Sequence, residues 1–508
     1  MLTGELLHGL IMPVARTYSR AQVGIDAPLV TVEADLASGL PQIIIVGLPE
    51  TAVRESKDRV KSALNNAGFT LPSRRVTINL APADLPKQGG RYDLAIALCV
   101  LAASGQLDAE TIANKEFLGE LSLAGDLRGV HGVLPAILHS QKSQRELTIP
   151  TDNQAEASLV REAAVNLAAS LGEVVEYLTR ARQPHYAPEP AYLKAKPTLL
   201  LSDIRGQYLA KRALIVAAAG AHNLLLVGPP GTGKTMLASR LPSLLPPMAQ
   251  HESLEMASVQ SVSRFNFLPE NWGTRPFRNP HHTASGVALV GGGNPPLPGE
   301  ISLAHNGVLF LDELPEFSRH VLEVLREPLE SGVIVISRAN HQVTYPARFQ
   351  LVSAMNPCPC GYSGDGTNRC DCRSDQIERY RGRISGPLLD RIDLHIHVPP
   401  LPRGTLLAPP ADLEHEHHDA VELVSQARQI MMKRNGCVNA HLSSKQTEQF
   451  CPLSQANRLM LDNAMQKLGL SARGYYKVLK VARTLADLSG DTNLATPHLV
   501  EALAFRRW

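Results

Sequence analysis

The sequence has little of several features that would each point to a particular class of protein. Aromatic residues make up only 5% of its 508 residues, and its 7 cysteines are too few and too unevenly placed for a disulfide scaffold. No stretch approaches the roughly 18 uninterrupted apolar residues that a membrane span requires, and the first residues lack a basic segment followed by a long apolar core. We therefore expect a cytoplasmic protein with no membrane partner.

The chain also lacks a strong excess of either charge. Its 50 Lys and Arg residues against 48 Asp and Glu residues leave a formal net charge of +2. Any nucleic acid would therefore be held by a local basic patch and not by the field of the whole protein. With 44% hydrophobic residues, the chain is long enough to bury more than one core.

Two proline-rich stretches divide the sequence and predict linkers at 183–197 and 399–410, because proline fixes φ and lacks an amide donor. Residues 1–182 mix short apolar runs with helical patterns, which predicts an α/β domain. Residues 198–398 alternate strand-like and helical segments, as in a parallel α/β sheet covered by helices. Residues 411–508 show helical periods and few strand signals. The predicted fold class is therefore α/β, followed by an all-α C-terminal domain.

A glycine-rich loop provides the clearest functional signal. The strand-like run 223–227 leads directly into Gly228-Pro229-Pro230-Gly231-Thr232-Gly233-Lys234-Thr235, and a helix-prone segment follows. This order is typical of a phosphate-binding loop, in which backbone amides surround the phosphates of ATP, Lys234 neutralises their charge and Thr235 ligates Mg²⁺. A glycine-rich turn without a ligand is the alternative.

Two further strand-like runs end in polar residues that suit ATP hydrolysis. The run 307–311 ends in Asp312, which would hold the metal ion directly or through water, and Glu313, which would activate the attacking water. An apolar strand whose acids merely cap a helix is the alternative. The run 349–355 ends at Asn356, whose amide is suited to polarising the same water.

The succession of these motifs resembles the AAA+ superfamily. The resemblance implies that Asn356 is the first sensor and that Arg391 is an arginine finger that reaches the γ-phosphate bound by a neighbouring subunit. A finger supplied by a neighbour implies a homo-oligomeric ring. The alternative for Arg391 is a surface arginine paired with Asp390 or Asp393.

A basic helix face in the C-terminal part adds one more candidate. Arg473, Lys477 and Lys480 follow one another at spacings of four and three residues, which places them on one side of a helix. By the same resemblance, Arg473 is the second sensor and contacts the γ-phosphate from the helical lid. A merely solvated face is the alternative.

Three segments narrow the resemblance to one family: 203–207, Asn279-Pro-His-His-Thr283 and Asn356-Pro-Cys-Pro-Cys-Gly361. Together they are similar to the magnesium-chelatase-like AAA+ proteins of the ComM/YifB branch, over essentially the whole chain. The resemblance implies a hexameric ATP-driven helicase that binds single-stranded or branched DNA without sequence preference and promotes branch migration in natural transformation. A chelatase motor subunit and a regulatory assembly protein are the alternatives.

Two segments of the central part match places where this group carries insertions. They are 278–299, which contains three consecutive glycines, and the hairpin-like stretch 331–341. In related ring helicases such hairpins line the pore, so Arg338, Asn340 and His341 are candidates for contacts with DNA phosphates. A surface hairpin without a ligand is the alternative.

The N-terminal part resembles the substrate-cleaving domain of Lon proteases through segments 85–90 and 119–128. The positions where Lon carries its serine nucleophile and lysine base hold Arg91-Tyr92-Asp93 and Gly132-Val-Leu-Pro135. Without a nucleophile and a base, acyl transfer has no route. We therefore predict a proteolytically inactive scaffold that serves ring assembly or DNA contact.

Four of the cysteines lie close together, at Cys358, Cys360, Cys370 and Cys372. Four thiolates in a glycine-rich loop suit a tetrahedral structural Zn²⁺ site, and an unmetallated, redox-sensitive loop beside Asn356 is the alternative. The acidic and histidine-rich run 414–418 favours a solvated helix start over a second metal site.

Overall fold

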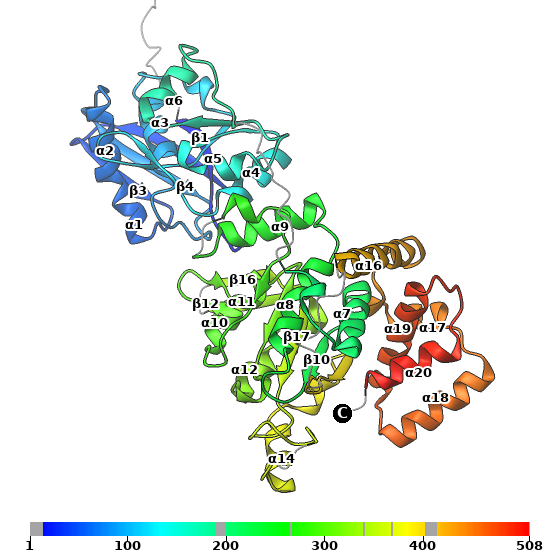
Figure 1. Ribbon diagram of the computed structural model, residues 1–508. Coiled ribbons are helices and arrows are strands. Elements are labelled where there is room, and N and C mark those ends of the chain that lie inside the picture. Colours follow the sequence, from blue (N-terminus) through cyan, green and yellow to red (C-terminus); the bar gives the residue numbers. More distant parts are fainter. Residues whose placement is uncertain are drawn as a thin grey trace, which may run out of the picture. The chain divides into compact units, whose positions relative to one another are not determined.

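The computed structural model describes residues 14–187, 199–264, 267–338, 341–366, 369–401 and 414–506 (Figure 1). The chain forms two compact units, one of Met1–Leu193 with Ala257–Trp272 and one of Lys194–Met256 with Gly273–Trp508. Sheets covered by helices and a helical C-terminal region confirm the predicted fold class. Among the described residues, no helix combines the length and the apolar character needed to cross a bilayer.

The first unit is built on a seven-stranded mixed sheet with the strand order β3-β4-β2-β1-β5-β8-β9. Alternate residues of β2 and β4 are buried, as expected for strands that present one face to a core. Helix α3 (Asp93–Ala103) is buried along its whole length. The strands are β1 (Ala15–Arg20), β2 (Leu29–Ala37), β3 (Gln42–Val46), β4 (Arg75–Ala81), β5 (Lys115–Phe117), β8 (Glu146–Pro150) and β9 (Val165–Ala168).

Short helices and one small hairpin complete this unit. They are α1 (Thr51–Arg54), α2 (Ser56–Asn66), α4 (Val133–Lys142), α5 (Gln154–Ala157), α6 (Leu171–Leu178) and the strand pair β6 (Glu120–Leu121) and β7 (Leu127–Arg128). Helix α9 covers Gln250–Ser261.

The second unit is built on a five-stranded sheet with the order β11-β14-β17-β10-β18, in which every neighbouring pair is parallel. All residues of β10, β14 and β17 are buried, which explains their uninterrupted apolar sequences. The strands are β10 (Leu224–Val227), β11 (Phe277–Arg278), β14 (Val308–Leu311), β17 (Gln350–Met355) and β18 (Leu394–His397).

The C-terminal helices share a hydrophobic core with this sheet. Leu214 of α7 (Tyr208–Gly220), Val424 of α16 (Glu414–Asn435) and Leu485 of α19 (Ala472–Leu488) belong to one buried cluster that also contains β10 and β17 side chains. The remaining C-terminal helices are α17 (Ser444–Phe450), α18 (Gln455–Leu468) and α20 (Thr496–Ala504).

The predicted insertions form small elements around the parallel sheet. The segment 278–299 contains α10 (Gly286–Val290) and the strand pair β12 (Gly291–Gly292) and β13 (Leu297–Pro298). The predicted hairpin is present as β15 (Val333–Arg338) paired with β16 (His341–Pro346). The other helices are α8 (Lys234–Leu244), α11 (Glu300–Leu303), α12 (Arg319–Val324), α13 (Pro328–Ser331), α14 (Ser374–Arg381) and α15 (Gly386–Leu389).

Candidate nucleotide site

The parallel sheet brings three of the sequence motifs together at the carboxyl ends of its strands. Gly228, Asp312 and Asn356 directly follow β10, β14 and β17, which are adjacent and parallel. Their side chains and loops therefore meet at the carboxyl ends of the strands, where open α/β sheets bind ligands.

The glycine-rich loop has the backbone conformation that its glycines allow. Gly231 and Gly233 have φ values of 77° and 87°, in the left-handed region that glycine adopts without a steric penalty. Gly228 donates its N–H to the carbonyl of Met355 at 3.2 Å, and an added Cβ there would lie 2.2 Å from the carbonyl oxygen of Val398. The loop is thus closely packed against the sheet at Gly228, and its two glycines with positive φ allow the turn into α8.

Lys234, the first residue of α8, lies inside this loop. Its Nζ donates to the carbonyls of Gly228 and Pro229 at 2.7 and 2.9 Å and to Oδ1 of Asn356 at 3.1 Å. Burial lowers the pKa of the Lys234 ammonium, and the carboxylates of Asp312 and Glu313 oppose that shift. An ammonium that is buried and bonded only to neutral oxygens is well prepared to exchange them for phosphate oxygens.

Thr235 and Asp312 form the part of the site that suits a divalent cation. The Thr235 hydroxyl donates to Oδ2 of Asp312 at 2.7 Å, and Oδ1 of Asp312 accepts the backbone N–H of Glu313 at 2.9 Å. A hydroxyl beside a carboxylate offers the hard oxygen ligands that Mg²⁺ takes together with phosphate oxygens and water. These residues therefore fit Mg²⁺ bound with a nucleotide.

Glu313 has a partner that motif reading did not supply. Its backbone is in the left-handed region, with φ of 50°, and its Oε2 lies 3.1 Å from Nδ1 of His282. The His282 ring contacts His281 in a tilted arrangement, with the ring centroids 4.1 Å apart, and meets Phe317 edge-on. The sequence signal was present, since these two histidines are part of the segment 279–283.

The cysteine loop lies next to the glycine-rich loop. An added Cβ at Gly361 would lie 2.8 Å from Cδ of Pro230, so the two loops are in contact. The four cysteine sulfurs lie within 4.8 Å of one another, with Cys358 buried and Cys360 exposed. In a tetrahedral Zn–S₄ site with bonds of about 2.3 Å, the sulfurs are about 3.8 Å apart. The Cys358–Cys370 and Cys360–Cys370 distances of 3.8 and 3.6 Å are close to that value.

Arg391 lies at the amino ends of the strands, opposite the carboxyl ends where the glycine-rich loop begins. It precedes β18, and its carbonyl accepts the side-chain N–H of Asn223, the residue before β10. The four residues of β10 separate Asn223 from Gly228, a path of about 16 Å along an extended strand. Arg391 is therefore remote from the glycine-rich loop of its own chain.

Arg473 lies beside Arg391 and not beside Lys234. Nη2 of Arg391 and Nη2 of Arg473 both bond Oε1 of Glu330, the former at 2.8 Å. Lys477, one turn along α19, donates to the carbonyl of Arg391 at 2.9 Å and to Asp393 at 2.6 Å. Of the helix face expected to be either a sensor or merely solvated, Lys477 thus contacts the Arg391 segment, whereas Lys480 donates to the carbonyl of Ala440. Arg391 itself pairs with Glu330, and not with Asp390 or Asp393.

A buried polar cluster lies at the amino ends of β10 and β18, next to the Arg391 segment. Burial alone would raise the pKa of the Asp393 carboxyl, but Lys477 and His222 together with hydrogen bonds hold it at about 2. Burial lowers the pKa of His222 to about 4, while its Nε2 shares a hydrogen bond of 2.8 Å with the Thr484 hydroxyl. The cluster therefore joins α7, β18 and α19 with His222 in its neutral form.

In the N-terminal unit, the positions that correspond to the protease residues are buried. Tyr92 and Asp93 have no exposed surface, and Asp93 accepts a bond of 2.7 Å from Nε of Arg59. Val133 and Leu134, at the place of the lysine base, are also fully buried. These positions thus hold buried side chains, and the lack of protease activity stays a prediction.

Comparison with known proteins shows which family this chain belongs to. Three family descriptions match: "Subunit ChlI of Mg-chelatase" at 32–153, "Magnesium chelatase, subunit ChlI" at 200–406 and "Magnesium chelatase, subunit ChlI C-terminal" at 415–506. The chain is 54% identical to competence protein ComM of Haemophilus influenzae, over 97% of this chain and 98% of that protein. The chain belongs to the ComM/YifB family. Its similarity to YifB of Escherichia coli, at 47% identity over 97% of both chains, agrees with this assignment.

The ComM/YifB assignment also places the chain within the magnesium-chelatase-like AAA+ ATPases. The magnesium-chelatase 38 kDa subunit of Rhodobacter capsulatus is 26% identical over 61% of this chain and 87% of that protein. The similarity to ComM/YifB proteins thus extends further along the chain than the similarity to this chelatase subunit, in agreement with the expected resemblance over essentially the whole chain.

Proposed function

We propose that the protein is an ATP-driven DNA motor, a hexameric ring that promotes branch migration of incoming DNA during natural transformation. Two observations support this proposal together. The residues for ATP binding and hydrolysis gather at one edge of the sheet, while the candidate finger Arg391 lies at the other. The relative called competence protein ComM is similar over nearly its whole length.

The site geometry suggests how hydrolysis proceeds. Lys234 exchanges its loop carbonyls for phosphate oxygens, and Thr235 and Asp312 hold Mg²⁺, which neutralises phosphate charge when bound. Glu313 orients and activates the attacking water, and Asn356 polarises it from the end of β17. Positioning and electrostatic stabilisation supply most of the rate in such a reaction.

The distance between Arg391 and the glycine-rich loop of the same chain supports the proposed ring. Arg391 cannot reach a nucleotide on Lys234 of its own chain, whereas a head-to-tail neighbour can present that nucleotide to it. Arg473 lies on the same Glu330 carboxylate, so we extend the proposal to both arginines. In this reading the second sensor also acts on the neighbour's γ-phosphate.

DNA contact is assigned to the β15–β16 hairpin. Arg338 and His341 are its last paired residues and flank the tip, and Asn340 lies outside the described residues. A cation in this place holds DNA phosphates without reading bases, which suits a motor that moves along any sequence.

The cysteine loop is proposed to hold a structural Zn²⁺ ion. Cys358, Cys360, Cys370 and Cys372 provide four sulfurs within 4.8 Å of one another, and two of their distances, 3.8 and 3.6 Å, are near the tetrahedral value. Because Gly361 contacts Pro230, a rigid loop here would fix one wall of the nucleotide site.

The deciding experiment measures the ATPase rate with and without branched DNA, for the unaltered protein and for Glu313→Gln. We expect DNA to stimulate hydrolysis, and Glu313→Gln to lower kcat at least about 100-fold while ATP still binds. If DNA neither binds nor stimulates while Glu313→Gln still abolishes hydrolysis, the ATPase stands and the DNA motor fails. A chelatase motor is the weaker candidate, because the match to the chelatase 38 kDa subunit covers only 61% of the chain.

A further inference from the structure

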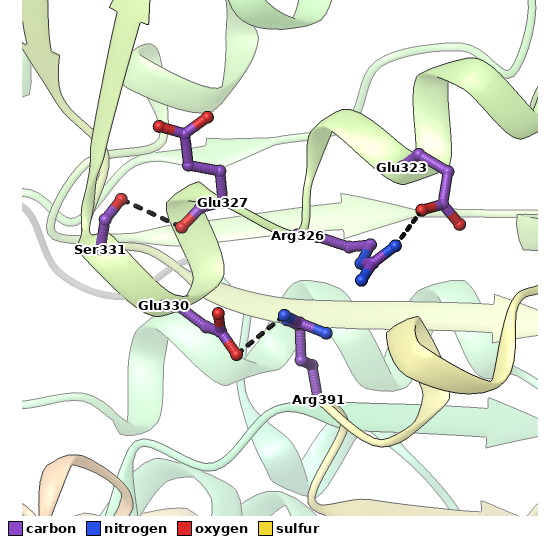
Figure 2. Close-up of a pocket in the computed structure, with 6 residues that line it drawn as sticks. All are labelled: Glu323, Arg326, Glu327, Glu330, Ser331 and Arg391. Atoms are coloured by element: carbon purple, nitrogen blue, oxygen red, sulfur yellow. Dashed lines mark hydrogen bonds and ion pairs between the residues drawn. The ribbon is translucent and has the colours of Figure 1, made fainter.

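Glu330 occupies the point where the two candidate trans-acting arginines meet. It belongs to α13, and its Oε1 accepts from Nη2 of Arg391 at 2.8 Å and from Nη2 of Arg473. Figure 2 shows the Glu330 and Arg391 side chains facing one another. Both residues line a pocket of about 360 Å³. One carboxylate oxygen thus bridges a residue before β18 and a residue of the lid helix α19.

The two arginines are positioned by other groups of their own chain. Nη1 of Arg391 donates to the carbonyl of Pro387 at 2.7 Å, and Lys477 holds the Arg391 carbonyl. The Ser471 hydroxyl at the start of α19 donates to Asp390 at 3.2 Å. These bonds hold the Arg391 segment and the start of α19 together, so both guanidinium groups can reach one oxyanion that has more than one acceptor.

A carboxylate in this place resembles one edge of a terminal phosphate, with negative charge and oxygens that accept from guanidinium groups. Glu330 is about half exposed, with 48% of its side-chain surface accessible, whereas only 10% of the Arg391 side chain is accessible. Pairs with an exposed member are weak, so a more highly charged ligand can replace Glu330.

We propose that Glu330 is an internal placeholder for the γ-phosphate, an inference that rests on the proposed ring function. In the unassembled chain it pairs with both Arg391 and Arg473 and offsets part of their positive charge. In the ring, the terminal phosphate of the nucleotide held by a second copy displaces it and takes both arginines.

The position of Glu330 in the chain connects this exchange to the DNA hairpin. Ser331 donates its hydroxyl to the carbonyl of Glu327 at 3.0 Å and accepts the N–H of Val333, the first residue of β15, at 3.3 Å. Ala347, just after β16, donates to the carbonyl of Gly332 at 2.8 Å. Helix α13 is therefore fastened to both strands of the hairpin, and a strand of DNA that shifts the hairpin also shifts Glu330.

The test compares Glu330→Gln with Glu327→Gln in the full-length protein. Glutamine keeps the shape of the side chain and removes the charge, and Figure 2 shows Glu327 directed away from Arg391, which makes it a matched control. The ATPase rate per chain is measured over a range of protein concentrations, with and without branched DNA. We expect Glu330→Gln to raise the basal rate at low protein concentration roughly threefold to tenfold and to reduce the stimulation by DNA, and Glu327→Gln to change neither.

Glu330→Asp provides a second variant that retains the charge but shortens its reach, and the basal rate should rise in it as well. An unchanged or lower basal rate in both Glu330 variants, with thermal unfolding unchanged, would overturn the placeholder. A raised basal rate with undiminished stimulation would overturn the connection to the hairpin. The proposed function fails separately, if Arg391→Ala hydrolyses ATP at the normal rate.

Discussion

His282 contacts the candidate catalytic carboxylate of Glu313, and no sequence motif had given His282 a role. Its Nδ1 lies 3.1 Å from Oε2 of Glu313, and its ring is supported by His281 and Phe317. A group that orients a catalytic base affects the chemical step more than nucleotide binding. His282→Ala should therefore lower kcat roughly tenfold with little change in KM for ATP.

The matched control is His281→Ala, which removes the supporting ring but keeps the group that contacts Glu313, and should have a smaller effect. Steady-state ATPase kinetics separate the two parameters. Equal kcat for His282→Ala and the unaltered protein would show that Glu313 needs no such partner.

The candidate site residues that lie together in the structure are those that short, contiguous motifs indicated in the sequence. Hydrogen bonds connect Lys234 with Asn356 and Thr235 with Asp312, because the loops that carry them follow neighbouring strands of the same parallel sheet. The Glu330 contact could not be predicted, because helical spacing tells which face Arg473 occupies but not what that face packs against. Contacts such as Glu330–Arg473 depend on tertiary packing between segments that lie far apart in the sequence.

At the scale of elements, the cysteine loop gives a prediction on metal removal. If the four sulfurs hold Zn²⁺, Cys372→Ser should reduce the bound metal below half an equivalent and lower the ATPase rate severalfold, because the loop contacts Pro230 and carries Asn356. Metal analysis of protein purified without a histidine tag provides the measurement.

Cys437→Ser provides the control, since this cysteine lies outside the cluster and should leave the zinc content unchanged. Less than half an equivalent of zinc in the unaltered protein would contradict the site itself and leave a metal-free thiol loop.

The hairpin gives a second prediction at this scale. Arg338→Glu places a negative charge at the end of β15 and should weaken binding of single-stranded DNA about tenfold at low salt, with a shallower dependence on salt concentration. Fluorescence anisotropy over a salt series measures both quantities. Lys445→Glu, on α17, carries the same charge change and should have little effect; similar losses in both variants would point to a nonspecific charge effect.

The elements themselves were predictable to different degrees. Buried parallel strands appear as apolar runs, which made β10, β14 and β17 visible in the sequence. The hairpin was predicted at 331–341, but its second strand continues to Pro346, because β16 alternates buried and exposed residues instead of forming an apolar run. Short elements such as β12 and β13 gave no periodic signal.

For the whole molecule, the separation of the two half-sites predicts complementation between inactive variants. Lys234→Ala removes nucleotide binding but keeps Arg391, and Arg391→Ala does the reverse. Each should be inactive alone. An equimolar mixture should recover up to about a quarter of the normal ATPase rate, because one junction in four pairs an intact loop with an intact finger. No recovery after subunit exchange would contradict a finger supplied in trans.

The stability of the second unit should depend on pH through the buried cluster at the amino edge. The pKa of His222 is lowered to about 4 by burial, so between pH 6.5 and 4 the unfolded chain binds a proton that the folded chain does not. The contribution of neutral His222 to the free energy of unfolding is therefore present above pH 6.5 and is lost as the pH falls toward 4. The loss is on the order of 3 kcal/mol at most. Thermal unfolding from pH 7.5 to 4.5 should show a smaller acid shift for His222→Gln.

The overall architecture was predictable because composition and periodicity distinguish an α/β sheet from a helical bundle. The shared core of α7, α16 and α19 was not, since an amphipathic helix does not show in its sequence which sheet it covers. The boundaries at 183–197 and 399–410 lie largely outside the described residues and remain predictions.

The placement of Lys234 and Arg391 at opposite edges of one sheet has a genetic consequence. In the proposed ring, each copy takes part in two junctions, one that it loads with nucleotide and one that it completes for a neighbour. A copy that carries both Lys234→Ala and Arg391→Ala spoils both. In a cell that makes equal amounts of normal and doubly altered protein, only about a quarter of the junctions join two normal copies. Such an allele would be dominant over the intact gene although it adds no new activity.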